Sequence, residues 1–137
     1  MVLCVLCGLQ IKMTENNLSN QVIGEAIIVH KELGPGLLVS VYETCLAYRL
    51  LKSGVNVERQ KAIPLIFEDV KMDCGFRCDI LVEGKLIVEV KAIDALNDIH
   101  MAQILTHLKL TNIRLGLLLN FNVIKLRDGI KRIINGF

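Results

Sequence analysis

The stretch "RCDILVEGKLIVEVKAI", residues 77–93, decides the fold of this chain. It contains two apolar runs around the short break Glu83–Lys85, which is the pattern of a β-hairpin with a three-residue loop. Charged side chains interrupt both runs, at Asp79 in the first and at Glu89 and Lys91 in the second. Charges are rare inside apolar strands unless they are paired or bind something, so these three positions are candidates for a functional site.

The expected hairpin register places the two acidic residues opposite each other. With the three-residue loop, Val82 opposes Leu86, and counting back along both strands brings Asp79 directly opposite Glu89. Directly opposed residues have Cβ atoms about 4.5–5.5 Å apart. Residues two apart on a strand share a face, so Lys91 is expected on the same side as Glu89.

This arrangement has a chemical consequence. Two opposed carboxylates on apolar strands repel each other, and a divalent cation such as Mg²⁺ or Mn²⁺, which prefers oxygen ligands, removes that repulsion. Lys91 can then stabilise the charge that develops on a phosphate during hydrolysis, so the three residues predict a metal-dependent phosphodiesterase. The alternative is that Lys91 neutralises Glu89 while Asp79 meets solvent at a sheet edge, and spacing alone favours this alternative.

Further strands are expected on both sides of the hairpin. Residues 57–67 form a strand in which Pro64 indicates an edge position or a bulge, and Glu68-Asp69 make a turn into the strand 70–82. Residues 113–121 are a continuous apolar run, which is typical of a buried strand.

Helical periodicity appears in four segments. Ser19 and Asn20 are expected to cap the first helix, and Asn97-Asp98 the third. In chain order the segments are residues 21–34, 37–52, 99–110 and a short basic helix over 128–136. The element order α-α-β-β-β-α-β-α predicts an α/β sandwich around a mixed sheet.

Length and composition fit one globular domain. The chain has 137 residues, of which 53% are hydrophobic and 22% charged. A net charge of +2 neither demands nor excludes a nucleic-acid partner. Five cysteines without an evident signal peptide indicate reduced thiols and a cytoplasmic protein, and Cys4-x-x-Cys7 lacks the second pair that a zinc site needs.

The first twelve residues differ from the rest of the chain. They are apolar, but they are too few to span a membrane, which takes about twenty apolar residues. Polar residues suited to capping a helix follow Met13. We therefore expect residues 1–12 to be a non-native or disordered extension and residues 13–137 to form a single domain, with no membrane partner.

Four segments together carry a resemblance to a known family. They are "HKELGPGLLVSVYETCLAYRL" (30–50), "CDILVEGKLIVEVKAI" (78–93), "AQILTHLKL" (102–110) and "LGLLLNFNVIKLRDGIKRIIN" (115–135). In this order they resemble the GxxExxY protein family of the PD-(D/E)XK nuclease superfamily, over about residues 18–136. The resemblance implies a restriction-endonuclease-like α/β core of αβββαβ order, with a mixed sheet flanked by helices.

The resemblance also implies roles for individual residues. By the superfamily pattern, Asp79 and Glu89 are metal ligands for Mg²⁺ or Mn²⁺, and Lys91 is the catalytic lysine. Gln103 matches the helix glutamine of the exonuclease-like branch, which is associated with the active site. Gln103 and His107 share a face of the expected helix, and a solvated helix face is the alternative. The implied substrate is DNA.

The chain departs from the family motif Gly-x-x-Glu-x-x-Tyr. Gly36 and Tyr42 are present, but position 39 is Val, and position 107 is His where the family has Tyr. Glu43 lies one turn beyond Val39 on the same helix face, so it either compensates in part or is an ordinary surface acid. Tyr42 either supports the site or packs in the core.

Two functions stay open from the sequence. One is a Mg²⁺-dependent nuclease of reduced activity, which the intact Asp79, Glu89 and Lys91 favour. The other is a catalytically inactive nuclease-fold module that binds nucleic acid or a protein partner, which Val39 favours. A homodimer is left open as well.

Overall fold

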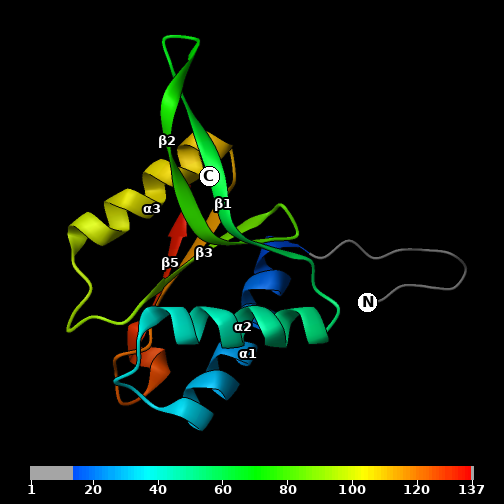
Figure 1. Cartoon of the computed structure of the whole chain (residues 1–137), viewed down its shortest axis with the longest axis vertical. Helices are drawn as coiled ribbons and strands as arrows, with labels where there is room; N and C mark the ends of the chain where they lie inside the picture. Colours follow the sequence, from blue (N-terminus) through cyan, green and yellow to red (C-terminus); the bar gives the residue numbers. More distant parts are fainter. Residues whose placement is uncertain (1–13, 137) are drawn as a thin grey trace, which may run out of the picture.

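The computed structural model describes residues 14–136; the predicted extension 1–12, with Cys4 and Cys7, lies outside the described residues. The described chain forms a five-stranded sheet with α1 and α2 packed on one face and α3 on the other (Figure 1). The elements are α1 (Glu15–Leu33), α2 (Val39–Lys52), β1 (Val57–Phe67), β2 (Val70–Val82), β3 (Leu86–Lys91), α3 (Asp98–Thr111), β4 (Leu115–Asn120), the 3-10 helix η1 (Leu126–Gly129) and β5 (Ile130–Ile134).

The sheet is mixed, and its strand order follows the chain from β1 to β5. β1, β2 and β3 form an antiparallel meander, and α3 then carries the chain back so that β4 pairs parallel with β3. Parallel neighbours need such a crossover, which is usually a helix. The predicted αβββαβ core with a mixed sheet flanked by helices is therefore confirmed.

Alternation along β3 builds the core on both faces of the sheet. Leu86, Val88 and Val90 pack with α1 and α2, whereas Ile87 packs with Ile104 of α3. β4 is buried along its whole length, as its continuous apolar run predicts.

β2 changes the face that it presents to the core at Asp79. Cys78 packs in the cluster under α3, but Ile80, two residues later, packs in the cluster under α1 and α2. A regular strand keeps such residues on one face. On β1, Gln60 has a φ of 50° and lies between the paired residues Arg59 and Lys61. The β1–β2 ribbon therefore turns at Gln60 and Asp79.

The start of the first helix differs from the prediction. Thr14 is the N-cap, because its side chain accepts a hydrogen bond from the Asn17 backbone nitrogen at 3.1 Å, and Ser19 is fully buried inside the helix. The apolar period begins only at Leu18, so the polar first turn carries no core-facing residue that would predict it. The second helix likewise begins at Val39 rather than at residue 37.

The predicted basic helix over 128–136 is wrong. After η1, the chain forms β5, which pairs antiparallel with β4 from Leu119↔Ile130 to Leu115↔Ile134. Ile130 and Ile133 pack on opposite faces of the sheet. Apolar residues three apart are compatible with one face of a helix and also with a strand that is buried on both faces. The unpaired edge of β4 decides between them, because its buried backbone groups need partners.

The reading of Pro64 is confirmed in both of its forms. β1 is the edge strand of the sheet, and its register with β2 shifts between Pro64 and Ile66. Glu68 and Asp69 both have positive φ, which is the backbone of a tight hairpin turn. Gly75 faces Pro64, and a Cβ there would lie 2.6 Å from the Ile63 carbonyl oxygen.

Candidate active site

Two carboxylates meet where the β2–β3 ladder ends. The predicted register is found, with Val82 opposite Leu86 and the last ladder pair at Ile80↔Val88. Beyond that pair, Glu89 Oε2 accepts a hydrogen bond from the Asp79 backbone nitrogen at 3.2 Å, and Asp79 Oδ2 accepts one from the Val90 backbone nitrogen at 2.8 Å. Each acidic side chain thus binds the backbone of the opposite strand, which holds the two acids together.

Lys91 and Asp79 line one open cleft of about 730 Å³. Lys91 is half-buried, and its side chain forms no ion pair or hydrogen bond with the described atoms of residues 14–136. The alternative reading, in which Lys91 neutralises Glu89, is therefore not found. The cleft is lined by Leu37, Leu38, Val39, Ser40, Glu43, Arg59, Gln60, Asp79, Val90, Lys91, Ala92 and Ile93.

A third carboxylate reaches this cleft from α2. Glu43 is only 6% exposed, and its Oε2 accepts a hydrogen bond from Arg59 Nε at 3.1 Å and forms an ion pair with Arg59 Nη2 at 3.0 Å. Gln60 Nε2 donates to Glu43 Oε1 at 2.9 Å and to Asp79 Oδ1 at 3.4 Å. Gln60 therefore connects Glu43 to the acid pair, and Glu43 is not an ordinary surface acid.

Val39 lies at the rim of the cleft and not in the core. It is the first residue of α2 and is 41% exposed. The first turn of α2 contains no acidic residue, and Leu38 provides no side-chain cap. The family glutamate would stand at this helix N-terminus, where the helix dipole favours a negative charge.

Gln103 and His107 of α3 have different surroundings. His107 is turned inward: its ring stacks on Phe76 with centroids 4.0 Å apart, and its Nδ1 lies 3.8 Å from Glu89 Oε2. Gln103 is exposed, and its side chain forms no hydrogen bond with the described atoms of the chain. The structure thus brings His107 to the acid pair, whereas Gln103 stays in solvent.

Tyr42 supports the rim of the cleft from inside. It is fully buried, stacks on Phe121, donates to the Gly34 carbonyl oxygen at 2.6 Å and accepts from the Leu37 backbone nitrogen at 3.0 Å. The hydroxyl therefore fixes the turn between α1 and α2, which carries Leu37 and Leu38 to the cleft.

We expect Tyr42→Phe to lower the free energy of unfolding by about 1–3 kcal/mol, because two part-buried hydrogen bonds, each worth about 0.5–1.5 kcal/mol, are lost. Tyr48→Phe is the matched control, since Tyr48 is exposed. Urea unfolding of both variants measures the difference. Equal stability of Tyr42→Phe and wild type would show that the turn does not depend on this hydroxyl.

The acid pair also affects a buried thiol. Burial, and after it the negative charges of Glu89 and Asp79, raise the pKa of Cys78 to about 12. The thiol therefore stays protonated at neutral pH and is a poor metal ligand, so the candidate site depends on oxygen donors.

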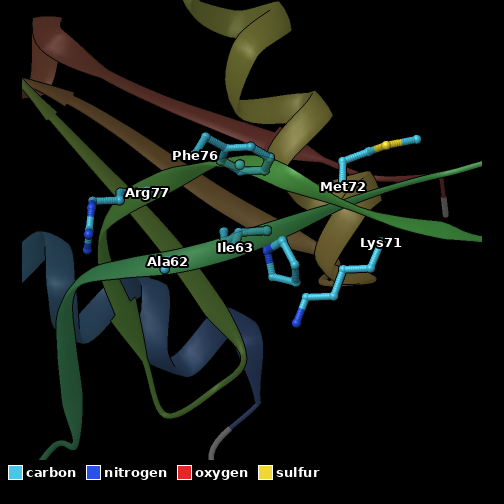
Figure 2. Close-up of a pocket in the computed structure, with 8 residues that line it drawn as sticks. Ala62, Ile63, Lys71, Met72, Phe76 and Arg77 are labelled. Atoms are coloured by element: carbon cyan, nitrogen blue, oxygen red, sulfur yellow. The ribbon is translucent and has the colours of Figure 1, made fainter.

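A second hollow, of about 580 Å³, lies on the β1–β2 hairpin. Figure 2 shows Lys71 and Arg77 at opposite ends of it. Among the described side chains that line it, none is acidic. Its connection to the cleft is Arg77, whose Nη1 donates to the Gln60 carbonyl oxygen at 2.9 Å.

The oxygen donors at the end of the β2–β3 ladder suit a hard divalent cation. Within the described residues, no group of three or more His, Cys, Asp and Glu side chains is placed to hold a metal ion. Asp79 and Glu89 provide two carboxylates, and Mg²⁺ is commonly held by one or two carboxylates together with water and substrate phosphates. The residues therefore fit Mg²⁺ or Mn²⁺ in an open site and not in a closed protein cage.

The fold and the cleft define a nuclease-like α/β domain, with two carboxylates and a lysine at the end of a central hairpin. A family profile described as the PD-(D/E)XK nuclease superfamily matches residues 16–133. The chain belongs to this superfamily. The match does not test the narrower resemblance to the GxxExxY family, which stays a prediction. No curated protein and no solved structure matches the chain.

Sequence reasoning missed Arg59 and Gln60. Both lie in an edge strand, where polar residues usually face solvent, and their types alone do not separate a cleft residue from a surface residue. Glu43 was a weak signal for these two residues. A carboxylate on the helix face near the site needs hydrogen-bond donors, and the following strand is the nearest source of them.

In the part of the chain from residue 14 to residue 136, no helix has both the length and the hydropathy of a membrane span.

Proposed function

We propose that this protein is a Mg²⁺- or Mn²⁺-dependent nuclease that hydrolyses DNA phosphodiester bonds. The observation that carries the proposal is the reciprocal pair of hydrogen bonds that holds the Asp79 and Glu89 carboxylates together beside Lys91. Membership of the PD-(D/E)XK nuclease superfamily supports a nuclease-like function and nucleic-acid binding. DNA as the substrate is part of the proposal.

Asp79 and Glu89 would hold the cation. Gln103 is exposed to solvent, so its proposed role is contact with the bound substrate and not with the cation. A bound divalent cation neutralises phosphate charge and promotes ionisation of water. Lys91 is half-buried and unpaired within residues 14–136, so its ammonium group is available for the negative charge that develops on the phosphate. Water adds to phosphorus, the phosphorus–oxygen bond breaks, and the leaving oxygen takes up a proton.

The direct experiment measures Mn²⁺ binding by calorimetry and cleavage of plasmid, single-stranded DNA and RNA in Mg²⁺, Mn²⁺ or EDTA. We expect binding of about one cation per chain and DNA cleavage that EDTA abolishes. Metal binding with cleavage of RNA alone would overturn the substrate assignment, and the absence of both metal binding and cleavage would overturn the nuclease.

Val39→Glu should raise DNA cleavage on the order of 100-fold, because an additional carboxylate at the rim fixes the reacting groups more firmly. The exposed position and the acid-free first turn of α2 predict no loss of stability and a gain of about 0.3–1 kcal/mol. Val39→Gln is the matched control, because it has the same size without the charge. A folded Val39→Glu protein with unchanged metal binding and no cleavage would count against the nuclease.

The second candidate function is a nuclease-fold module without catalysis that binds nucleic acid or a protein partner. Two observations favour it: position 39 is Val, and both Glu43 oxygens already accept hydrogen bonds from Arg59 and Gln60. Such a module would bind DNA in EDTA as tightly as in Mn²⁺ and would not cleave it. The predicted cytoplasmic location and the homodimer stay predictions.

A further inference from the structure

We infer that the side-chain amide of Gln60 competes with a divalent cation for the carboxylate oxygens of the cleft, and so sets the metal affinity of the site. The inference rests on the proposed function, since it concerns the same carboxylates. It assigns a role to a residue that the nuclease pattern of two acids and a lysine does not include.

The orientation of the Gln60 amide follows from its neighbours. Its terminal atom lies 2.9 Å from Glu43 Oε1 and 3.4 Å from Asp79 Oδ1. Both partners are carboxylates, which only accept hydrogen bonds when they are ionised, so this atom must be the donating nitrogen and not the oxygen. A neutral N–H donor therefore lies between two negative charges that would otherwise face each other.

The backbone holds Gln60 in this place at a cost. Its φ of 50° is in the left-handed region, which is rare for a residue other than glycine inside a strand. Two groups maintain it: Arg77 Nη1 donates to its carbonyl oxygen at 2.9 Å, and the two carboxylates accept from its amide. Strained backbone that is held by several contacts is typical of functional sites.

The amide and a cation exclude each other at these oxygens. Mg²⁺ binds oxygen at about 2.0–2.1 Å and needs the lone pairs that point toward it. Asp79 Oδ2 already accepts from the Val90 backbone nitrogen, so Oδ1, which faces Gln60, is the oxygen left for a cation. A cation that binds Oδ1 from the side that Gln60 faces displaces the Gln60 N–H from Asp79, and the amide thereby lowers the apparent metal affinity.

Two variants separate the amide from the backbone strain. Gln60→Ala removes the amide and keeps a Cβ at the positive φ, whereas Gln60→Gly removes the amide and also relieves the strain. Because the hydrogen bond from Gln60 to Asp79 is long, at 3.4 Å, but its acceptor is charged, we expect both variants to bind Mn²⁺ about three- to tenfold more tightly than wild type in calorimetry. We also expect Gln60→Ala to have a lower melting temperature than wild type in EDTA. Addition of Mn²⁺ should raise the melting temperature of Gln60→Ala by more than it raises that of wild type.

Gln21→Ala is the matched control, because Gln21 Nε2 also donates between two elements, to Ser53 Oγ at 3.1 Å, but does not line the cleft. It should leave Mn²⁺ affinity unchanged. If wild type binds Mn²⁺ and both Gln60 variants bind it equally or more weakly, the competition is overturned but the metal site is not. Tighter binding by Gln60→Gly alone would assign the effect to strain and would also overturn it. No Mn²⁺ binding by any of these proteins would overturn the competition together with the metal site.

Discussion

Asp79→Asn is expected to abolish Mn²⁺ binding and to reduce DNA cleavage by at least on the order of 1,000-fold, because it removes one of two carboxylate ligands. The fold should remain. Asn keeps an oxygen that accepts the hydrogen bond from the Val90 backbone nitrogen, and the change removes a negative charge beside Glu89. The long hydrogen bond from Gln60, at 3.4 Å, is the contact that it loses. We expect the free energy of unfolding without metal to be unchanged or raised by roughly 0.2–1 kcal/mol.

Calorimetry with Mn²⁺, urea unfolding in EDTA and plasmid cleavage measure these three quantities on one preparation. Asp69→Asn is the matched control: Asp69 is exposed in the β1–β2 turn, and Asn also adopts its left-handed backbone readily. If Asp79→Asn binds Mn²⁺ like wild type, the assignment of Asp79 as a ligand is wrong, whatever happens to cleavage.

Lys91→Ala is expected to lower cleavage by about 100- to 1,000-fold and to leave Mn²⁺ affinity within a few-fold of wild type. Removal of one donor aimed at a developing negative charge has effects of about this size. The Lys91 side chain forms no ion pair or hydrogen bond with the described residues, so its removal breaks no such contact. An effect on cleavage can therefore be separated from an effect on the fold. Its stability should therefore stay within about 0.5 kcal/mol of wild type.

Single-turnover cleavage at saturating Mn²⁺ measures the chemical step without the contribution of metal binding. Lys31→Ala, an exposed lysine of α1 outside the cleft, controls for a general loss of positive charge. Lys91→Ala with wild-type cleavage would remove Lys91 from the catalytic machinery. A parallel loss of Mn²⁺ affinity would instead show that Lys91 organises the carboxylates.

Local patterns in the sequence predicted most of the fold correctly. The three-residue break and the alternation of residues around it fixed the β2–β3 register, and with it the meeting of Asp79 and Glu89. The continuous apolar run of β4 and the capping residue Asn97 of α3 were also correct. These features depend on neighbours in the chain, where periodicity and turn geometry act directly.

The errors fall where two distant segments decide the outcome. Ile130 and Ile133 suit a helix or a strand, and only the unpaired edge of β4 selects the strand. On α3, Gln103 and His107 share a helix face by spacing, yet His107 packs on Phe76 of β2 while Gln103 remains exposed. Sequence spacing gives the direction of a side chain from its helix, but the neighbouring sheet covers only part of that face.

The hairpin sequence predicted the pairing of Asp79 with Glu89 and the place of Lys91, whereas the αβββαβ core was predicted from periodicity along the chain and from the family resemblance. Only the tertiary structure decided that Glu43 faces these acids, that Val39 lies exposed at the rim, and that Gln60 donates between Glu43 and Asp79. The physical reason is that α2 and the turning point of β1 approach the hairpin through packing across the sheet. No periodicity within either segment encodes that approach.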